Sequence, residues 1–258
     1  MTTNLLKTRA GATITNAASG TNVFEIAPGI IRISTPVPPE AIPGGFTFNQ
    51  FLIVADQPLL FHTGLKKMFP VVREAVEHVL GDVAKLRYVG FSHFESDECG
   101  SLNEWLAIAP QAEPVCSVIG AMVSVNDFAD RPARALADGE DLSLGNRNVR
   151  WFDAPNLPHN WECGYLFETT GRTLLCGDIF THGGHDPDPI TEGDILGPSI
   201  ATHRGGLSGM GHDANARAIL AKLARTEPTT LALMHGSSYR GDGAKALSAF
   251  GDELFGKA

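Results

Sequence analysis

Residues 91–100, FSHFESDECG, place one histidine and three carboxylates within six consecutive positions. These side chains are His93, Glu95, Asp97 and Glu98, and they directly follow the apolar run KLRYVGF, which is typical of a buried β-strand. Carboxylates this close repel one another, and a positive charge among them favours their ionised forms. The stretch therefore predicts a cationic partner at the end of this strand.

Three more residues of metal-ligand type follow other strand-like runs. His159 comes after WFDAPNLP, Asp178 after RTLLCG and His235 after TTLALM. Sites are commonly built where rigid strands pass into loops. Together with His93, these positions give three histidines and four carboxylates, enough for two metal ions that share a ligand. The carboxylates, whose combined charge of −4 would balance two divalent cations, are Glu95, Asp97, Glu98 and Asp178.

Each of these residues also has an ordinary structural explanation. A single histidine at a strand end is more often hydrogen-bonded within the fold than a ligand, and an acidic run is usually a solvated loop. The repetition of one pattern, an apolar strand followed by a ligand-type residue, favours the metal site. Tyr239, four residues after His235, is a candidate to donate a hydrogen bond to an oxygen species on the metal. His182, His185 and His203 are interpreted as surface-loop residues, with a group that contacts the metal ligands or a lid as the alternatives.

The composition of the whole chain narrows the functional classes. Its 258 residues suffice for one large α/β domain, and a net charge of −9 argues against nucleic acid or an anionic membrane as the main partner. No apolar run approaches the roughly 20 residues that a membrane helix needs. The cysteines at positions 99, 116, 163 and 176 form no CxxC motif, so neither a zinc knuckle nor a disulfide framework is indicated. A cytoplasmic protein is therefore expected.

Strand-like and helical patterns alternate along the chain. Helical periodicity covers 70–80, 101–109, 121–129 and 213–224, and strand-like runs cover 29–35, 49–56, 58–64, 86–91, 114–119, 149–155, 164–169, 172–180 and 229–236. This distribution predicts two packed sheets with helices outside. Residues 1–22 read as a polar tail and 23–258 as a single domain. Within it, the Gly/Asp/Pro-rich segment 181–211 is expected to be an irregular loop.

The order H-x-E-x-D…H…D…H, with GDIF after a hairpin and LMHGSSY near the end, resembles the metallo-β-lactamase fold superfamily over roughly residues 25–240. The resemblance implies an α/β (α+β) fold with four αββα layers. FLIVADQPLLFHTG is similar to the opening strand–turn–strand of that fold, with His62 where Asp is usual. Glu95, where most hydrolases of the superfamily have histidine, and the tryptophan close behind His159 resemble the di-iron branch, which comprises flavodiiron and oxygen-binding di-iron proteins.

Carried over to this sequence, the resemblance implies two iron ions with a shared carboxylate. Glu98 stands where most of the superfamily has histidine, and its carboxylate can still serve as a ligand. The ligand chemistry agrees, because added carboxylates suit iron and manganese, whereas zinc readily takes imidazole and thiolate. The implied ligands are His93, Glu95 and His159 for one iron, Asp97 and His235 for the other, and Asp178 as the bridge.

The implied function is that of a soluble non-haem di-iron protein that binds or reduces dioxygen, with nitric oxide as another substrate. Flavodiiron reductases carry a flavodoxin-like FMN domain after this one, whereas 23 residues follow His235. Electrons are therefore expected from a separate partner protein, or the protein acts as an O2 binder or sensor. The alternatives are a zinc- or manganese-dependent hydrolase, in which the cluster activates water, and a metal-free scaffold. The sequence leaves a homodimer open.

Overall fold

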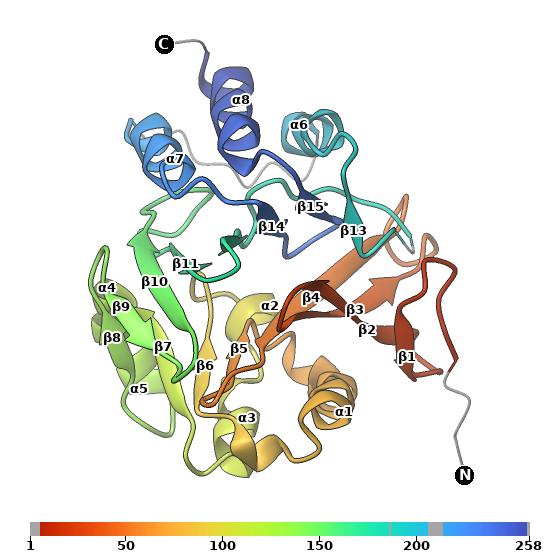
Figure 1. Ribbon diagram of the computed structural model, residues 1–258, viewed down its shortest axis with the longest axis vertical. Helices are drawn as coiled ribbons and strands as arrows, with labels where there is room; N and C mark the ends of the chain where they lie inside the picture. The colour runs from red at the N-terminus through yellow and green to blue at the C-terminus, as the bar shows by residue number, and fades with distance from the viewer. Residues whose placement is uncertain (1–5, 186, 206–213, 257–258) are drawn as a thin grey trace.

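Apolar side chains are buried on both faces of two β-sheets, which lie face to face between outer layers of helices (Figure 1). The computed structural model describes residues 6–185, 187–205 and 214–256. This arrangement confirms the αββα sandwich expected from the sequence. Among the described residues, no helix combines the length and the apolar character needed to cross a membrane.

The first sheet follows the chain order of its strands. Its first five strands pair antiparallel, and its last four run parallel to one another. The parallel part ends next to the acidic stretch identified above. Within the described residues, the strands are β1 (Thr13–Asn16), β2 (Thr21–Ala27), β3 (Ile30–Val37), β4 (Phe46–Ile53), β5 (Leu59–Phe61), β6 (Tyr88–Gly90), β7 (Glu113–Ser117) and β8 (Arg134–Leu136).

The second sheet is built from the later part of the chain. Within the described residues it contains β9 (Asp141–Ser143), β10 (Asn148–Asp153), β11 (Gly164–Glu168), β12 (Thr173–Leu175), β13 (Ile190–Thr191), β14 (Thr230–Ala232) and β15 (Ser238–Arg240). Their spatial order is β13-β15-β14-β12-β11-β10-β9. β12 and β14 pair in parallel, so the carboxyl ends of both strands lie at the same edge of the sheet.

Helices cover the two outer faces and fill the connections (Figure 1). The first sheet is covered by α1 (Phe69–Leu80) and α3 (Leu102–Ile108), and the second by α6 (Leu196–Arg204), α7 (Ala216–Ala224) and α8 (Gly243–Phe255). The short helical turns are η1 (Lys66–Met68), η2 (Val83–Lys85), α2 (Ser96–Cys99), α4 (Val118–Gly120), η3 (Ala121–Val125) and α5 (Asn126–Phe128).

Alternation along the strands creates three apolar layers. In β4, Leu52 packs against the helices of the first sheet, whereas its neighbour Phe51 faces the second sheet. In β11, Leu166 faces the first sheet, whereas its neighbour Tyr165 packs towards the helices of the second. Because successive side chains in a strand point to opposite faces, each sheet contributes to a central layer and to one outer layer.

The ends of α1 show why the sequence folds as it does locally. Pro70 lies in the first turn, where its missing N–H costs no hydrogen bond, and Val72, Ala75 and Val76 are buried at helical spacing. Gly81 ends the helix with a left-handed φ of 73°, and its N–H donates to the carbonyl of Glu77. Glycine reaches this conformation without the steric cost that other residues pay.

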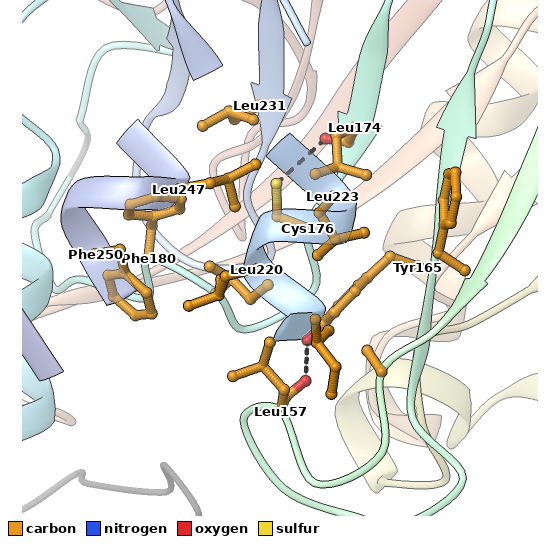
Figure 2. Packing of buried hydrophobic residues seen from close by; sticks show 14 of the residues in the cluster. Leu157, Tyr165, Leu174, Cys176, Phe180, Leu220, Leu223, Leu231, Leu247 and Phe250 are labelled. Atoms are coloured by element: carbon orange, nitrogen blue, oxygen red, sulfur yellow. Dashed lines mark hydrogen bonds between the residues drawn. The ribbon is translucent and has the colours of Figure 1, made fainter. Parts of the chain in front are cut away.

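The outer apolar layer of the second sheet extends to the loop before β11 (Figure 2). Leu220 of α7 and Leu247 of α8 pack onto residues of the sheet. The Tyr165 hydroxyl donates a hydrogen bond to the carbonyl of Leu157, and both residues belong to the same buried cluster. This bond ties the β10–β11 loop to the core two residues before His159.

The expected polar tail is shorter than residues 1–22, because β1 and the first residues of β2 are part of the sheet. Polar contacts, rather than apolar side chains buried at alternating positions, stabilise this edge of the sheet. The hydroxyl groups of Thr21 and Thr35 lie 2.9 Å apart in a buried hydrogen bond, and the Thr15 hydroxyl donates to the carbonyl of Thr21 at 3.2 Å. A sequence pattern based on burial of apolar side chains does not detect such a strand.

The segment 181–211 also differs from the expected irregular loop, because it contains β13 and α6. The Asp194 carboxylate accepts hydrogen bonds from the N–H groups of Leu196 and Gly197 and so starts α6. The apolar residues of α6 do not follow a helical period. The helix is stabilised by short-range polar contacts at its start and by a few buried residues. α7 begins at Ala216 with Asn215 as its N-cap residue, and the expected N-cap residue, Asp213, lies outside the described residues.

We expect Leu247→Ala to lower the free energy of unfolding by about 2–5 kcal/mol, since it removes a fully buried side chain from the layer shown in Figure 2. Ser248→Ala, at the next and exposed position of α8, is the matched control and should change it by about 0.5 kcal/mol or less. Urea denaturation of both variants, followed by circular dichroism, measures the difference. Equal effects would contradict the packing described above.

Candidate metal centre

The metal-ligand-type residues named from the sequence all lie at one edge of the sandwich, where strands of both sheets pass into loops. The first sheet supplies the segment after β6, which includes the short helix α2. The second sheet supplies the loop between β10 and β11 and the turns after β12 and β14. The residues brought together in this way are His93, Glu95, Asp97, Glu98, His159, Asp178 and His235.

Four of these side chains form a first group around a common point. The Nε2 atoms of His93 and His159 lie 2.9 Å apart, and each lies within 3.0 Å of Oε2 of Glu95. Oδ2 of Asp178 lies 3.6 Å from Nε2 of His159. Two ligand atoms at about 2.1 Å from one ion, and at right angles around it, are about 3 Å apart. The spacing of these atoms therefore fits a single metal ion.

Asp97, Glu98 and His235 form the second group. Nε2 of His235 lies 3.4 Å from Oδ2 of Asp97 and 3.2 Å from Oδ1 of Asp178. Asp178 therefore directs one carboxylate oxygen to each group, which is the geometry of a ligand that bridges two ions.

Two glycines allow the backbone to place Asp178 and His235. Gly177 has a φ of 49°, and a Cβ atom there would lie 3.0 Å from the Ser92 hydroxyl oxygen. Gly236 has a φ of 90°, and a Cβ atom there would collide with the ring of His182. Both positions therefore combine a left-handed backbone with close packing, which suits glycine alone.

Hydrogen bonds from outside the two groups orient the histidines. Nδ1 of His235 lies 2.8 Å from the carbonyl of Thr47, and a carbonyl can only accept, so Nδ1 carries the hydrogen and Nε2 faces the second group. The ring of Phe46 stacks on His235 with a centroid distance of 4.3 Å. Outer hydrogen bonds of this kind fix the tautomer and the direction of a metal-binding histidine.

His93 is held by a chain of neutral groups. Its Nδ1 lies 2.9 Å from the Ser92 hydroxyl oxygen, which lies 3.1 Å from Nε2 of His62. Burial lowers the pKa of His62 to about 3, so this imidazole is neutral at physiological pH. His62 stands where the resemblance leads one to expect Asp, and the orientation of His93 therefore depends on a hydroxyl and an imidazole instead of a carboxylate.

The surroundings shift the pKa values of the ionisable groups at the site in different directions. Hydrogen bonds from His159 and His93 lower the pKa of Glu95 to about 2. Burial, reinforced by the charges of Asp178 and Asp97, raises the pKa of Glu98 well above its usual value. Burial opposes the charged form of His235, but the carboxylates of Asp178 and Asp97 raise its pKa to about 10. Protons therefore provide the positive charge when no metal is bound.

Glu98 provides a test of whether these residues fit a metal. Its side chain is fully buried, and within the described residues neither carboxylate oxygen accepts a hydrogen bond from a nitrogen or hydroxyl donor. A buried carboxylate without partners is costly, unless a cation coordinates it. The orphaned oxygens point to a cation in the second group, and the donor set of carboxylates and imidazoles suits iron or manganese.

A cavity of about 290 Å³ adjoins the two groups. Phe46, Phe48 and Pro158 give it an apolar wall, and Thr181 and His203 also line it. The sequence raised only His203 as an alternative member of the site, and it pointed to none of the other four, because no motif marks a wall that is assembled from distant segments.

The other histidines and the tyrosine considered from the sequence have different positions. Tyr239 lies on β15, packs against the outer apolar layer of the second sheet and is not among the residues that line the cavity. His182 is buried and does not lie on the surface, and its Nε2 accepts a hydrogen bond from the N–H of Ser237 at 3.0 Å. His185 is exposed, as expected, whereas His203 is buried against the cavity.

Comparison with known proteins identifies the family. Residues 46–236 match the family described as ODP family beta lactamase, and this segment is most of the chain. The chain belongs to this family. The matched region includes every residue of the two groups described above.

Curated relatives extend the comparison. The chain is 27% identical over 198 residues to the "Putative diflavin flavoprotein A 2" of Synechocystis, an alignment that covers 74% of this chain and 32% of the relative. It is 28% identical over 142 residues to the "Rubredoxin-oxygen oxidoreductase" of Megalodesulfovibrio gigas, covering 54% of this chain and 34% of the relative. The aligned region therefore spans about a third of the length of these relatives.

Solved structures show the same fold. The metal-soaked flavodiiron core from Synechocystis superposes with a TM-score of 0.76 at 21% identity, over 91% of this chain and 61% of that one. A fragment of the putative diflavin flavoprotein A 5 from Nostoc gives 0.77 at 19% identity, over 90% of this chain and 94% of that one. The metallo-β-lactamase-like architecture expected from the sequence is therefore confirmed.

The pKa of His235 predicts how metal binding depends on pH. Below about pH 10, Nε2 of His235 holds a proton that a metal ion must displace. Affinity at the second group should therefore rise at least about tenfold per pH unit between about pH 7 and pH 9. Glu95, with a pKa of about 2, is already ionised in this range and adds no such dependence to the first group. Chelator competition at several pH values measures this, and a pH-independent affinity would contradict the assignment.

The chain from His93 to His62 predicts the effect of Ser92→Ala. Loss of the hydroxyl removes the hydrogen bond to Nδ1 of His93, so metal affinity of the first group should fall about 10–100-fold. The exposed Ser248→Ala variant is the control and should bind metal as the unaltered protein does. Titration of both variants against a chelator of known affinity compares them. Affinities within about twofold of each other would show that Ser92 does not orient His93.

Proposed function

We propose that this protein is a non-haem di-iron protein that binds and reduces dioxygen or nitric oxide. The proposal rests mainly on one observation: two groups of ligand-type side chains lie side by side, and Asp178 directs one carboxylate oxygen to each. Membership of the ODP family and the similarity to flavodiiron cores support it. The proposed ligands are His93, Glu95 and His159 for one iron, Asp97, Glu98 and His235 for the other, and Asp178 as the bridge.

The ligand set favours iron over zinc. Four of the seven proposed ligands are carboxylates, and hard oxygen donors stabilise iron, above all its oxidised state. Zinc sites are usually richer in imidazole or thiolate and have fewer ligands per ion. When bound, the irons would supply the electrons that a diatomic molecule accepts.

The residues of the chain itself contribute orientation and exclusion of water. Thr47 and Ser92 direct the imidazoles of His235 and His93 into the site through their hydrogen bonds. Phe46 and Phe48 form the apolar wall of the cavity and pack against the ring of His235. An apolar wall beside the ligands favours a small uncharged molecule over bulk water.

An electron donor is part of the proposal. Complete reduction of dioxygen to water consumes more electrons than a pair of ferrous ions can release, so turnover needs a second redox protein or domain. The names of two relatives, a rubredoxin-oxygen oxidoreductase and an anaerobic nitric oxide reductase flavorubredoxin, both refer to the electron carrier rubredoxin. We propose a donor of the same general kind for this chain.

Metal content tests the proposal directly. Protein produced with ample iron and purified without oxygen should contain close to two irons per chain, because both groups then hold an ion. Asp178→Ala should lose metal from both groups, whereas His185→Ala, at an exposed position, should retain it. Elemental analysis measures this, and oxygen-electrode recordings of the reduced protein should show rapid uptake. Stoichiometric zinc or manganese without uptake would favour a metallo-hydrolase, and absence of metal a scaffold.

A further inference from the structure

His203 is a buried imidazole that the proposed ligand set does not use. It lies in α6, is 6% exposed and lines the cavity beside the two groups. Neither of its ring nitrogens has a hydrogen-bond partner within the described residues. Buried polar groups in native proteins are nearly always hydrogen-bonded, so an exception calls for a partner that is absent from the bare chain.

The position of His203 makes it a neighbour of the metal centre and not one of its ligands. Its nitrogens belong to neither of the groups whose ligand atoms lie within 4.8 Å of one another. Phe250 of α8 contacts the ring edge to face, with a centroid distance of 5.5 Å and an interplanar angle of 73°. Packing of α6 against α8 therefore holds the imidazole in place.

The rest of the cavity wall contains few competing hydrogen-bond donors. Phe46, Phe48 and Pro158 are apolar, and the Thr181 hydroxyl already donates to the carbonyl of Asp178 at 2.8 Å. Burial lowers the pKa of His203, which keeps the ring neutral. A neutral imidazole still carries one N–H donor.

We propose that His203 donates a hydrogen bond to the small diatomic or triatomic molecule that binds at the metal centre. The inference rests on the proposed function and adds a binding residue to it. Molecules with negative charge at a metal accept such a bond most strongly, whether they are anions already, as azide is, or gain the charge from the metal, as dioxygen does. Opposite the apolar wall formed by Phe46, Phe48 and Pro158, a single fixed donor selects for them and sets their orientation.

Azide is the probe, and the variants separate hydrogen bonding from packing. His203→Leu removes the donor and keeps an apolar side chain, whereas His203→Gln keeps an N–H donor. At equal metal content, His203→Leu should raise the Kd for azide about tenfold, and His203→Gln by no more than about threefold. His78→Leu, on the exposed face of α1, is the control and should match the unaltered protein.

The infrared stretching band of bound azide is the second measurement. It should shift in His203→Leu and stay unchanged in His78→Leu, since only the former removes a bond to azide. Equal affinities and equal bands in His203→Leu and the unaltered protein would overturn the inference, and so would a His203→Gln variant as weak as His203→Leu. The band is measurable with zinc or manganese in the site as well as with iron. Elemental analysis of the same sample therefore distinguishes failure of the di-iron proposal from failure of the inference about His203. A protein that binds no metal would overturn both.

Discussion

The repulsion among carboxylates gathered around the fully buried Glu98 is the constraint on which the rest of the site depends. Asp97, Glu98 and Asp178 share one small region with His235, and in the metal-free protein the balance is kept by protons, as the raised pKa values of Glu98 and His235 show. Metal ions can replace those protons, which leaves the Glu98 carboxylate ionised and the His235 imidazole neutral. Folding of the loops and occupation of the site are therefore coupled through charge.

The sandwich brings this charge together from two directions. The first sheet supplies His93 and the acidic residues after β6, and the second supplies His159, Asp178 and His235 after its own strands. The central apolar layer between the sheets, which includes Phe51 and Trp151, fixes the distance between the two sets. The site is thus a product of sheet-on-sheet packing, and neither half of the chain contains it alone.

Neutral groups surround this charged centre and give it direction. The carbonyl of Thr47 and the hydroxyl of Ser92 orient His235 and His93, and Phe46 and Phe48 give the cavity one apolar wall. Similar folds occur in flavodiiron cores at 21% identity or less, so this architecture tolerates wide changes in sequence. His62 and Glu98 are the positions where this chain departs from the pattern that its own resemblance implied.

The sequence by itself determined the candidate ligands and the two-sheet architecture, because strand ends, ligand types and apolar periodicity are local signals. It did not determine distances. Tyr239 pairs with Leu231 across β14 and β15 and therefore faces the helices, whereas His203 reaches the cavity from a helix without periodicity. The position of Asp178 between the two groups and the strands within the expected tail likewise depend on contacts between residues far apart in the chain. Only the tertiary structure decides such contacts. An apolar pattern in the sequence indicates that a side chain is buried, but it does not indicate which residues bury it.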